Sequence, residues 1–473
     1  MFLDFFEGIS KIPRGSGNEK GISDYLCSWA KARGLYVFQD ESLNILIKKP
    51  GSKGYENSAP VIIQGHLDMV CEKNMDTEHD FLKDPIKTYI DGDFIKAKGT
   101  TLGADNGIAV AMAMEILDRQ DLLHPPIEVL MTTEEEVGLC GARAFDTSLL
   151  SGKYLINLDS GSEGEFLSSC AGGVTASLSI PLLYEAKPEG YADYNIFIKG
   201  LIGGHSGTEA DSGRANSVVL LGRLLNAIYK TNKACLLNIA GGSADNAIPR
   251  ESSATISIKE DGIQEITSLI EEYIAIFKKE YDGVDDGLSI VFEKSAEASL
   301  EALTNESGMK IIFALTLLPN GVSNMSMDLE GLVETSNNIG VIEIKSGSAI
   351  ISSSIRSSRA SKKEMLVNKF ENLAQLLGGV LELKGNYPGW EFKPGSEIRK
   401  MFLDTYKEMF NKEGEVKAIH GGLECGIFTE QTGIDAISLG PDLFSAHNPD
   451  EKLSISSSKN IFNLVIRVLE KLK

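Results

Sequence analysis

Short apolar runs alternate with helix-like segments over residues 1–172, which predicts an open α/β sheet. The runs VIIQGH (61–66), IEVLMTT (127–133) and YLINLD (154–159) have the length of buried strands, and each ends in polar residues. Between the first two runs, ADNGIAVAMAMEIL (104–117) is apolar on nearly all sides, as expected of a helix enclosed by its neighbours. We expect Asp105 to cap this helix, so that its first turn lies beside the strand ends.

From residue 173 the pattern changes to strand-rich segments mixed with amphipathic helices, which predicts an α+β domain. Its later half has apolar runs on either side of Ser346-Gly347-Ser348, a sequence typical of a β-hairpin. The two halves of this segment are only loosely similar, so an internal duplication stays open. After residue 386 the α/β pattern returns. The sequence therefore predicts an α/β domain of residues 1–172 and 387–473, interrupted by an inserted α+β domain of residues 173–386.

Composition and charge exclude several classes of protein. The 473 residues are 42 % hydrophobic and 24 % charged, the balance of a folded globular protein. The formal net charge of −21 disfavours binding to nucleic acid and to anionic membrane surfaces. No apolar run approaches the ~18 residues of a membrane span, and Asp4 and Glu7 interrupt the apolar start, unlike a secretory signal. The six dispersed cysteines form no CxxC pair, which fits free thiols in the cytoplasm.

Histidines and carboxylates follow the predicted strands, at the sheet edge where open α/β folds bind ligands. They are His66, Asp68, Asp105, the run Glu134–Glu136, Asp159 and His447. A solvated acidic turn is the alternative for the three glutamates, but in a cleft they repel one another unless a cation meets them. Imidazoles and carboxylates are ligands of zinc-like ions, and a shared carboxylate would hold two ions ~3.5–4 Å apart, as in metal-assisted hydrolysis.

Five segments in this order resemble the metal-site motifs of the M20 metallopeptidases: GHLDMV, TLGADNG, TTEEEVGLCGA, NLDS and AHNPDE. The segments GGSADNAIPRE, SSSIRSSR and HGGLECG, with the opening IPRGSGNE, resemble the aminoacyl-histidine (Xaa-His) dipeptidase branch of that family. The resemblance implies a mixed-sheet, zinc-peptidase-like catalytic domain with an inserted α+β lid domain. It also implies a homodimer.

The resemblance implies two divalent ions in each chain, with zinc expected and manganese or cobalt as alternatives. One ion would be bound by His66 and Asp159, and the second by Glu136 and His447. Asp105 would bridge the two ions.

Two further carboxylates would act beside the ions. The resemblance implies that Glu135 is the general base, which takes a proton from the metal-bound water and passes it to the departing amine. Asp68 would accept the second imidazole N–H of His66 and fix its tautomer. No role is implied for Glu134.

In the inserted domain, His205 lies among the glycines of GLIGGHSG, and a Gly-rich turn with an incidental histidine is the alternative. The resemblance implies that His205 stabilises the oxyanion, in its own subunit or across a dimer. Asn246 and Arg356 would bind the free carboxylate of a dipeptide, with Arg359 as a substitute for Arg356.

The segment HGGLECG supplies the remaining expected contacts with substrate. Gly422 would expose backbone amides, and Glu424 is a candidate for binding the substrate's free amine. His420 and Cys425 receive no role.

We therefore predict a cytoplasmic metallo-dipeptidase that cleaves Xaa-His and related dipeptides with metal-activated water. One alternative is an N-acyl amino acid deacylase or desuccinylase with the same metal site. The other is a non-catalytic protein that binds a cation or a peptide. The presence of Asp68 and Glu135, neither of which is needed merely to hold metal, argues against this last class.

Overall fold

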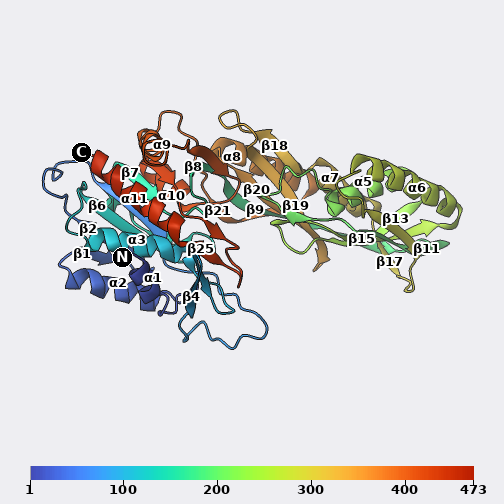
Figure 1. Ribbon diagram of the computed structural model, residues 1–473. Coiled ribbons are helices and arrows are strands. Elements are labelled where there is room, and N and C mark those ends of the chain that lie inside the picture. Colours follow the sequence, from blue (N-terminus) through green and yellow to red (C-terminus); the bar gives the residue numbers. More distant parts are fainter. Residues whose placement is uncertain (1) are drawn as a thin grey trace. The chain divides into compact units, whose positions relative to one another are not determined.

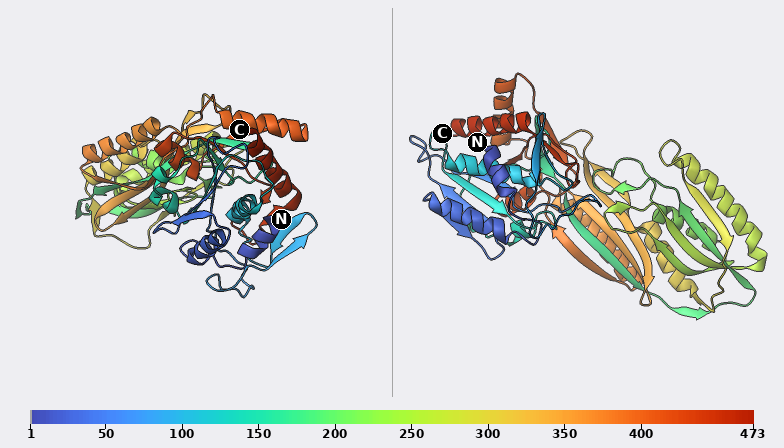
Figure 2. Two further views of the ribbon diagram at one scale, coloured as in Figure 1. Left: turned by 90° about the vertical axis from the view of Figure 1, so that its left-hand side faces the viewer. Right: turned by 60° about the horizontal axis from the view of Figure 1, so that its bottom comes forward.

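A computed structural model describes residues 2–473 of the chain, which form two compact units. Unit 1 comprises Met1–Cys170, Trp390–Ala418 and Leu423–Lys473, and unit 2 comprises Ala171–Gly389 and Ile419–Gly422. Each unit has a hydrophobic core of its own. Helices α1 and α11, near the two ends of the chain, both belong to unit 1 (Figure 2).

The main sheet of unit 1 has eight strands, of which the central ones run parallel (Figure 1). β3 pairs in parallel with β6 and β7, and β7 with β23, whereas the pairs β1–β2, β2–β6 and β8–β23 are antiparallel. β3, β6 and β7 are buried along their whole length, which is why they are continuous apolar runs. In sheet order the strands are β1 (Tyr36–Gln39), β2 (Ile45–Lys49), β6 (Ile127–Thr132), β3 (Val61–His66), β7 (Tyr154–Asn157), β23 (Asp435–Ser438), β8 (Glu165–Cys170) and β22 (Glu415–Ile419).

Helices cover both faces of this sheet. Gly65 of β3 faces α3, because a Cβ atom on Gly65 would lie 2.7 Å from Cβ of Ala109. On the other face, Gln64 donates a hydrogen bond to Glu424 at the start of α10. The helices of unit 1 are α1 (Phe2–Ile9), α2 (Lys20–Ala32), α3 (Ala104–Asp118), α4 (Cys140–Ala144), α9 (Glu397–Phe410), α10 (Glu424–Thr432) and α11 (Ile455–Lys471), with a 3₁₀ turn at Thr147–Leu149.

The start of α3 differs from the prediction. The helix is buried nearly all round, as expected, but it begins at Ala104 with Gly103 in the capping position. Asp105 and Asn106 have non-helical backbone angles, and the Asp105 carboxylate bonds to His66 and His447 rather than to the first N–H groups of α3, so Asp105 does not cap the helix. The backbone N–H groups of residues 102–105 instead donate to the carboxylate of Glu451, which lies far away in the sequence.

A second, four-stranded sheet of unit 1 joins the carboxyl-terminal part of the chain to a hairpin near residue 90. Its strands, in order, are β24 (Leu443–Phe444), β25 (Lys452–Ser454), β5 (Phe94–Ala97) and β4 (Thr88–Asp91). This pairing anchors the segment that carries His447.

Unit 2 is built on an antiparallel sheet of nine strands, whose long members are seen in Figure 2. The predicted hairpin is confirmed, since Lys345 pairs with Ser348 across a two-residue turn in which Ser346 and Gly347 have positive φ. The strands in order are β16 (Ser289–Lys294), β11 (Tyr191–Lys199), β15 (Ser252–Lys259), β13 (Ala234–Gly241), β19 (Val333–Lys345), β20 (Ser348–Ser357), β9 (Gly172–Pro181) and β21 (Val380–Tyr387), with β18 (Gly321–Met325) beside β19.

The helices of unit 2 pack on one face of this sheet (Figure 1). The strands alternate accordingly: Ile256 and Ile258 of β15 are in the core, whereas Ser253 and Thr255 are partly exposed. The helices are α5 (Ser217–Tyr229), α6 (Ile263–Glu280), α7 (Asn305–Leu317) and α8 (Ala360–Leu377), with a 3₁₀ turn at Glu260–Gly262. Two short strand pairs complete the unit, β10 (Tyr184–Ala186) with β17 (Glu301–Leu303), and β12 (Gly204–His205) with β14 (Ala247–Ile248).

None of the helices within residues 2–473 is long and apolar enough to cross a lipid bilayer.

Candidate metal centre

Two groups of ligand-type side chains meet at Asp105 in unit 1. His66 Nε2 lies 3.1 Å from Asp105 Oδ1 and 3.6 Å from Asp159 Oδ1. His447 Nε2 lies 3.2 Å from Asp105 Oδ2 and 3.0 Å from Glu136 Oε1. Each oxygen of the Asp105 carboxylate therefore faces a different histidine. The structure brings together all five residues that the sequence analysis proposed as ligands.

The topology of the sheet explains why these residues meet. His66 is the last residue of β3, Glu136 follows β6, and Asp159 follows β7. Because these strands are parallel, their carboxyl ends lie at one edge of the sheet. Asp105 lies in the first turn of α3, and His447 lies in the loop between β24 and β25. His447 has a φ of 61°, an uncommon conformation for a non-glycine residue.

The chemistry of this cluster fits a divalent metal ion. Ligand atoms of His66, Asp105 and Glu136 all lie within 4.8 Å of one another. Glu136 Oε1 is buried and accepts no hydrogen bond, although His447 Nε2 is 3.0 Å away, since that contact lacks hydrogen-bond geometry. Buried carboxylate oxygens without hydrogen bonds beside imidazole nitrogens form a donor set typical of zinc and related ions.

The negative charges of the carboxylates stabilise positive charge within the cluster. The nearby carboxylates of Asp105 and Glu136, Asp105 first, raise the pKa of His447 to about 10. Burial lowers the pKa of His66, but the carboxylates around it, Asp159 first among them, raise that pKa well above its ordinary value. Burial also raises the pKa of Asp159, because its charged form loses water. The cluster thus favours a bound cation.

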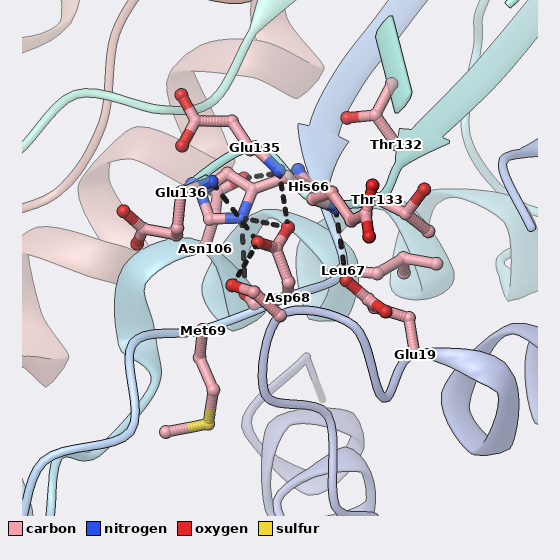
Figure 3. Close-up of polar contacts among 12 residues, drawn as sticks. Glu19, His66, Leu67, Asp68, Met69, Asn106, Thr132, Thr133, Glu135 and Glu136 are labelled. Atoms are coloured by element: carbon pink, nitrogen blue, oxygen red, sulfur yellow. Dashed lines mark hydrogen bonds and ion pairs between the residues drawn. The ribbon is translucent and has the colours of Figure 1, made fainter. Parts of the chain in front are cut away.

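Asp68 is fully buried and connects His66 to the turn of three glutamates (Figure 3). Its Oδ1 lies 3.3 Å from His66 Nδ1 and accepts the backbone N–H of Glu135 at 3.0 Å. Its Oδ2 accepts the Glu136 N–H at 3.2 Å and the Ser16 hydroxyl at 2.7 Å. Burial alone would raise the pKa of Asp68, but these hydrogen bonds, that from His66 first, lower it to about 2. Asp68 therefore stays ionised and orients the His66 ring.

The Glu135 side chain is directed away from Asp68 (Figure 3). Its carboxylate forms no hydrogen bond or ion pair with the residues that the structure describes. Burial raises the pKa of Glu135 well above its usual value, and the nearby carboxylates of Asp159, Glu424 and Glu136 add to the effect. A partly buried carboxyl group with no fixed partner beside a ligand cluster is suited to proton transfer.

Glu424 is more deeply enclosed than the sequence analysis assumed. It is 0 % exposed, and its Oε2 accepts a hydrogen bond from the Thr132 hydroxyl at 2.7 Å and another from Gln64. Burial raises its pKa to about 8. Its Oε1 has no hydrogen-bond partner among residues 2–473. The predicted contact with a substrate amine stays a prediction, and the burial of Glu424 argues against it.

His205 in unit 2 has a defined tautomer. The short pairing of β12 with β14 places it near Asn246, whose carbonyl accepts the N–H of Ser206 at 2.9 Å. His205 Nδ1 accepts the backbone N–H of Thr208 at 3.1 Å and that of Gly207 at 3.3 Å. Because Nδ1 is an acceptor, Nε2 carries the ring proton. Burial and the charge of Arg356 lower the pKa of His205, which keeps the ring neutral.

Arg356 and His420 lie beside His205 in the same unit. A Cβ atom on Gly207 would lie 3.0 Å from His205 Cε1, 3.3 Å from Arg356 Cζ and 2.7 Å from the His420 carbonyl oxygen. Arg356 is 9 % exposed, donates to the Tyr387 hydroxyl at 3.4 Å, and has a buried Nε without a hydrogen-bond partner. None of the carboxylates within residues 2–473 forms an ion pair with it. A buried guanidinium that has a donor without a hydrogen-bond partner and forms no ion pair with the described residues is suited to bind an anion.

Two other predicted contacts also lie in unit 2. Asn246 is exposed, and Gly422 packs against Tyr387, where an added Cβ would lie 2.9 Å from Tyr387 Cε2. Arg359, the possible substitute for Arg356, instead forms ion pairs with Asp328 and Glu334.

His420 is a buried histidine to which the sequence analysis gave no role. It is 6 % exposed, and its Nε2 lies 2.7 Å from the Ser336 hydroxyl oxygen. Burial, together with the charge of Arg356, lowers its pKa from an ordinary 6.5 to about 4.

This shift predicts a pH-dependent contribution to stability. Between the two pKa values the unfolded chain binds a proton at His420 that the folded chain does not bind. The stabilisation is therefore complete above the unfolded pKa and is lost as pH falls toward the folded pKa, by up to about 3 kcal/mol. We expect the unfolding free energy of His420→Gln, measured in urea, to fall less between about pH 7 and pH 4 than that of the parent chain. If the unfolding free energies of the variant and the parent chain depended equally on pH, the lowered pKa of His420 would be contradicted.

Three more residues near the ligands received no role from sequence. Arg14, Glu19 and Glu451 are all buried charged groups that bond to the backbone of ligand-bearing segments. Glu19, for example, accepts the N–H of Glu134 at 3.1 Å and so holds the glutamate turn. The available signal was that IPRGSGNE and AHNPDE, which contain these residues, carry part of the family resemblance.

Comparison with known proteins places the chain in a family. Residues 62–471 match the Peptidase family M20/M25/M40. The chain belongs to this family. It is 40 % identical over 470 residues to the cytosol non-specific dipeptidase of Escherichia coli (strain K12), with 99 % of this chain and 97 % of the relative covered. The predicted family is thus confirmed.

Two solved structures have the same fold as this chain. The crystal structure of aminoacylhistidine dipeptidase from Vibrio alginolyticus matches with a TM-score of 0.94 and 37 % identity, over 100 % of this chain and 96 % of that one. The aminopeptidase PepT from Bacillus cereus ATCC 10987 matches with a TM-score of 0.57 and 16 % identity, over 100 % and 98 % of the two chains, which shows a shared fold. The predicted mixed α/β fold and dipeptidase branch are confirmed.

Proposed function

We propose that the chain is a di-metal dipeptidase that hydrolyses dipeptides with metal-activated water. The observation that carries the proposal is the position of Asp105, whose two carboxylate oxygens each face a different histidine. His66, Asp159 and Asp105 would hold one ion, and Glu136, His447 and Asp105 the other. When bound, such a pair lowers the pKa of water and polarises the scissile carbonyl.

The chain's own residues would position and move the protons. His66 Nδ1 would donate its proton to Asp68, whose backbone oxygen lies 3.2 Å and whose Oδ1 lies 3.3 Å away, so that Nε2 faces Asp105 and Asp159 as an acceptor. Glu135, which has no fixed partner, would take a proton from the attacking water and deliver it to the departing amine. Its raised pKa suits a group that must be protonated and deprotonated in one turnover.

Unit 2 would serve as the lid that recognises the substrate. The Arg356 guanidinium and the Asn246 amide would bind the free carboxylate, which limits the substrate to very short peptides. His205 would donate Nε2–H to the developing oxyanion, and the neighbouring backbone N–H groups hold the tautomer that makes this possible. Gly422 would expose backbone amides to the substrate. The side chains of Arg356, Asn246 and His205 all belong to unit 2, so we propose that they bind the substrate together.

The names of two relatives support a proposal for the substrate and the cellular compartment. One is named a non-specific dipeptidase of the cytosol, and the other is named for aminoacylhistidine substrates. We propose that this chain cleaves Xaa-His dipeptides within a broader range, in the cytoplasm, as a homodimer. Zinc is the proposed ion, with manganese and cobalt as alternatives.

A screen of substrates against metals tests the function. Metal-free protein would be supplied with zinc, manganese or cobalt and assayed on Xaa-His dipeptides, other dipeptides and N-acetyl amino acids, with EDTA-treated protein as the blank. We expect metal-dependent cleavage of dipeptides and little action on N-acetyl amino acids, which lack the free amine. Preference for the N-acetyl compounds would indicate a deacylase. Binding of no more than one ion, with no hydrolysis, would indicate a non-catalytic protein.

A further inference from the structure

Glu451 is a buried carboxylate whose two oxygens are both bonded to one short stretch of backbone. Its Oε2 accepts the N–H groups of Leu102 at 2.7 Å and Gly103 at 3.0 Å. Its Oε1 accepts those of Ala104 at 2.8 Å and Asp105 at 3.3 Å. Glu451 is 2 % exposed. A side chain from the carboxyl-terminal part of the chain thus satisfies the free N–H groups at the start of α3, where a negative charge is favoured.

The carbonyl side of the same stretch is held by Arg14. Its guanidinium, 2 % exposed, donates to the Gly103 oxygen and also to the oxygens of Leu67 at 2.9 Å and Asp68 at 3.2 Å. Leu67 and Asp68 directly follow His66. Arg14 therefore ties the backbone that carries His66 to the backbone that precedes Asp105 through hydrogen bonds of its own.

Glu451 also belongs to the segment that carries His447. Its own N–H donates to the Asn448 oxygen at 2.9 Å, so a tight turn separates Glu451 from His447. Asp105 is thereby bound to this segment twice, through its carboxylate at His447 and through its N–H at Glu451. A shift of the segment would therefore act on both the backbone and the carboxylate of Asp105.

We propose that Glu451 is a positioning residue of the metal centre, which fixes the Asp105 backbone relative to His447. The inference rests on the proposed function, because it concerns how the two ions are held. Loss of Glu451 should lower the affinity for the ion that Asp105, Glu136 and His447 would bind. The affinity for the ion at His66 should fall less, because Arg14 still bonds both to the backbone that follows His66 and to the Gly103 oxygen.

A cobalt titration of the full chain tests this inference. Metal-free parent, Glu451→Gln and Glu128→Gln proteins would be titrated with Co²⁺ by calorimetry and by the visible absorption of bound cobalt, and their metal-free unfolding midpoints compared. Glu128 is the matched control: it is also 2 % exposed in unit 1 and accepts the N–H groups of Ser151 and Gly152, but at the start of β6, the opposite end from the ligands. Glutamine suits both sites, because its amide places a donor against backbone donors.

We expect the parent and Glu128→Gln to bind two ions with equal affinities, and Glu451→Gln to bind one of them about 10–100-fold more weakly. Parent affinities in Glu451→Gln, or an equal loss in both variants, would overturn the inference. If Glu451→Gln does not fold, Glu451→Asp, which keeps the charge but shortens the reach, should still show selective weakening of one ion, and unchanged affinities there would also overturn it. Failure of the parent to bind two ions would instead reject the proposed function.

Discussion

Replacing Glu135 with glutamine is expected to lower kcat for dipeptides by ~10²–10⁴-fold while the chain still binds two ions. The glutamine keeps the size of the side chain but cannot accept a proton from the attacking water. Metal binding should survive, because the backbone N–H of residue 135 still donates to Asp68 and the five ligand side chains are unchanged. Steady-state kinetics on an Xaa-His dipeptide and metal analysis of the same preparation measure the two effects.

Glu134→Gln is the matched control for this experiment, because it makes the same change one residue earlier in the same turn. It should leave kcat within a few-fold of the parent value. If Glu135→Gln turned over dipeptides at the parent rate, another group would have to be the general base. A loss of ions from the variant would instead identify Glu135 as a ligand.

Replacing Arg356 with alanine is expected to raise KM for dipeptides by ~10–100-fold, because charge-assisted hydrogen bonds to a carboxylate are lost. The binding of the two ions should not change, since Arg356 belongs to unit 2 and all five proposed ligands belong to unit 1. The parent enzyme should prefer a dipeptide to the corresponding dipeptide amide, which has no carboxylate charge. Arg356→Ala should lose this preference, and comparison of kcat/KM for acid and amide measures it.

Arg359→Ala is the control, because that guanidinium is three residues away and already forms ion pairs with Asp328 and Glu334. It should retain the preference for the free acid. If Arg356→Ala kept the full preference and Arg359→Ala lost it, the carboxylate site would lie at Arg359. Retention of the preference in both variants would move the site to other residues.

Much of the fold could be predicted because local patterns and tertiary environment agree. β3, β6 and β7 are buried on both faces, so burial demanded the continuous apolar runs that the sequence displays. The hairpin at Ser346-Gly347 could be predicted because that turn needs residues that tolerate positive φ. The start of α3 was predicted wrongly, because the groups that cap it come from Glu451, 346 residues further along the chain than Asp105.

In the candidate site, too, residues with a local sequence pattern could be predicted and contacts between distant residues could not. The positions of His66, Glu136 and Asp159 after apolar strands were sufficient to predict that they share one edge of the sheet. The roles of Arg14 and Glu451 were not visible, since a buried charge bonded to distant backbone leaves no local pattern. The enclosure of Glu424 by Gln64 and Thr132 was missed for the same reason.

The sequence by itself determined which side chains are available for a metal centre, and at which strand ends and loops they stand. Only the tertiary structure decided that one oxygen of Asp105 faces His66 and the other faces His447, 342 residues away. The physical reason is that the types of ligand follow from composition and spacing, whereas contacts across hundreds of residues depend on how sheets and helices pack. The same packing places His205, Arg356 and His420 together in unit 2, where Arg356 Nε is buried without a hydrogen-bond partner among the described residues.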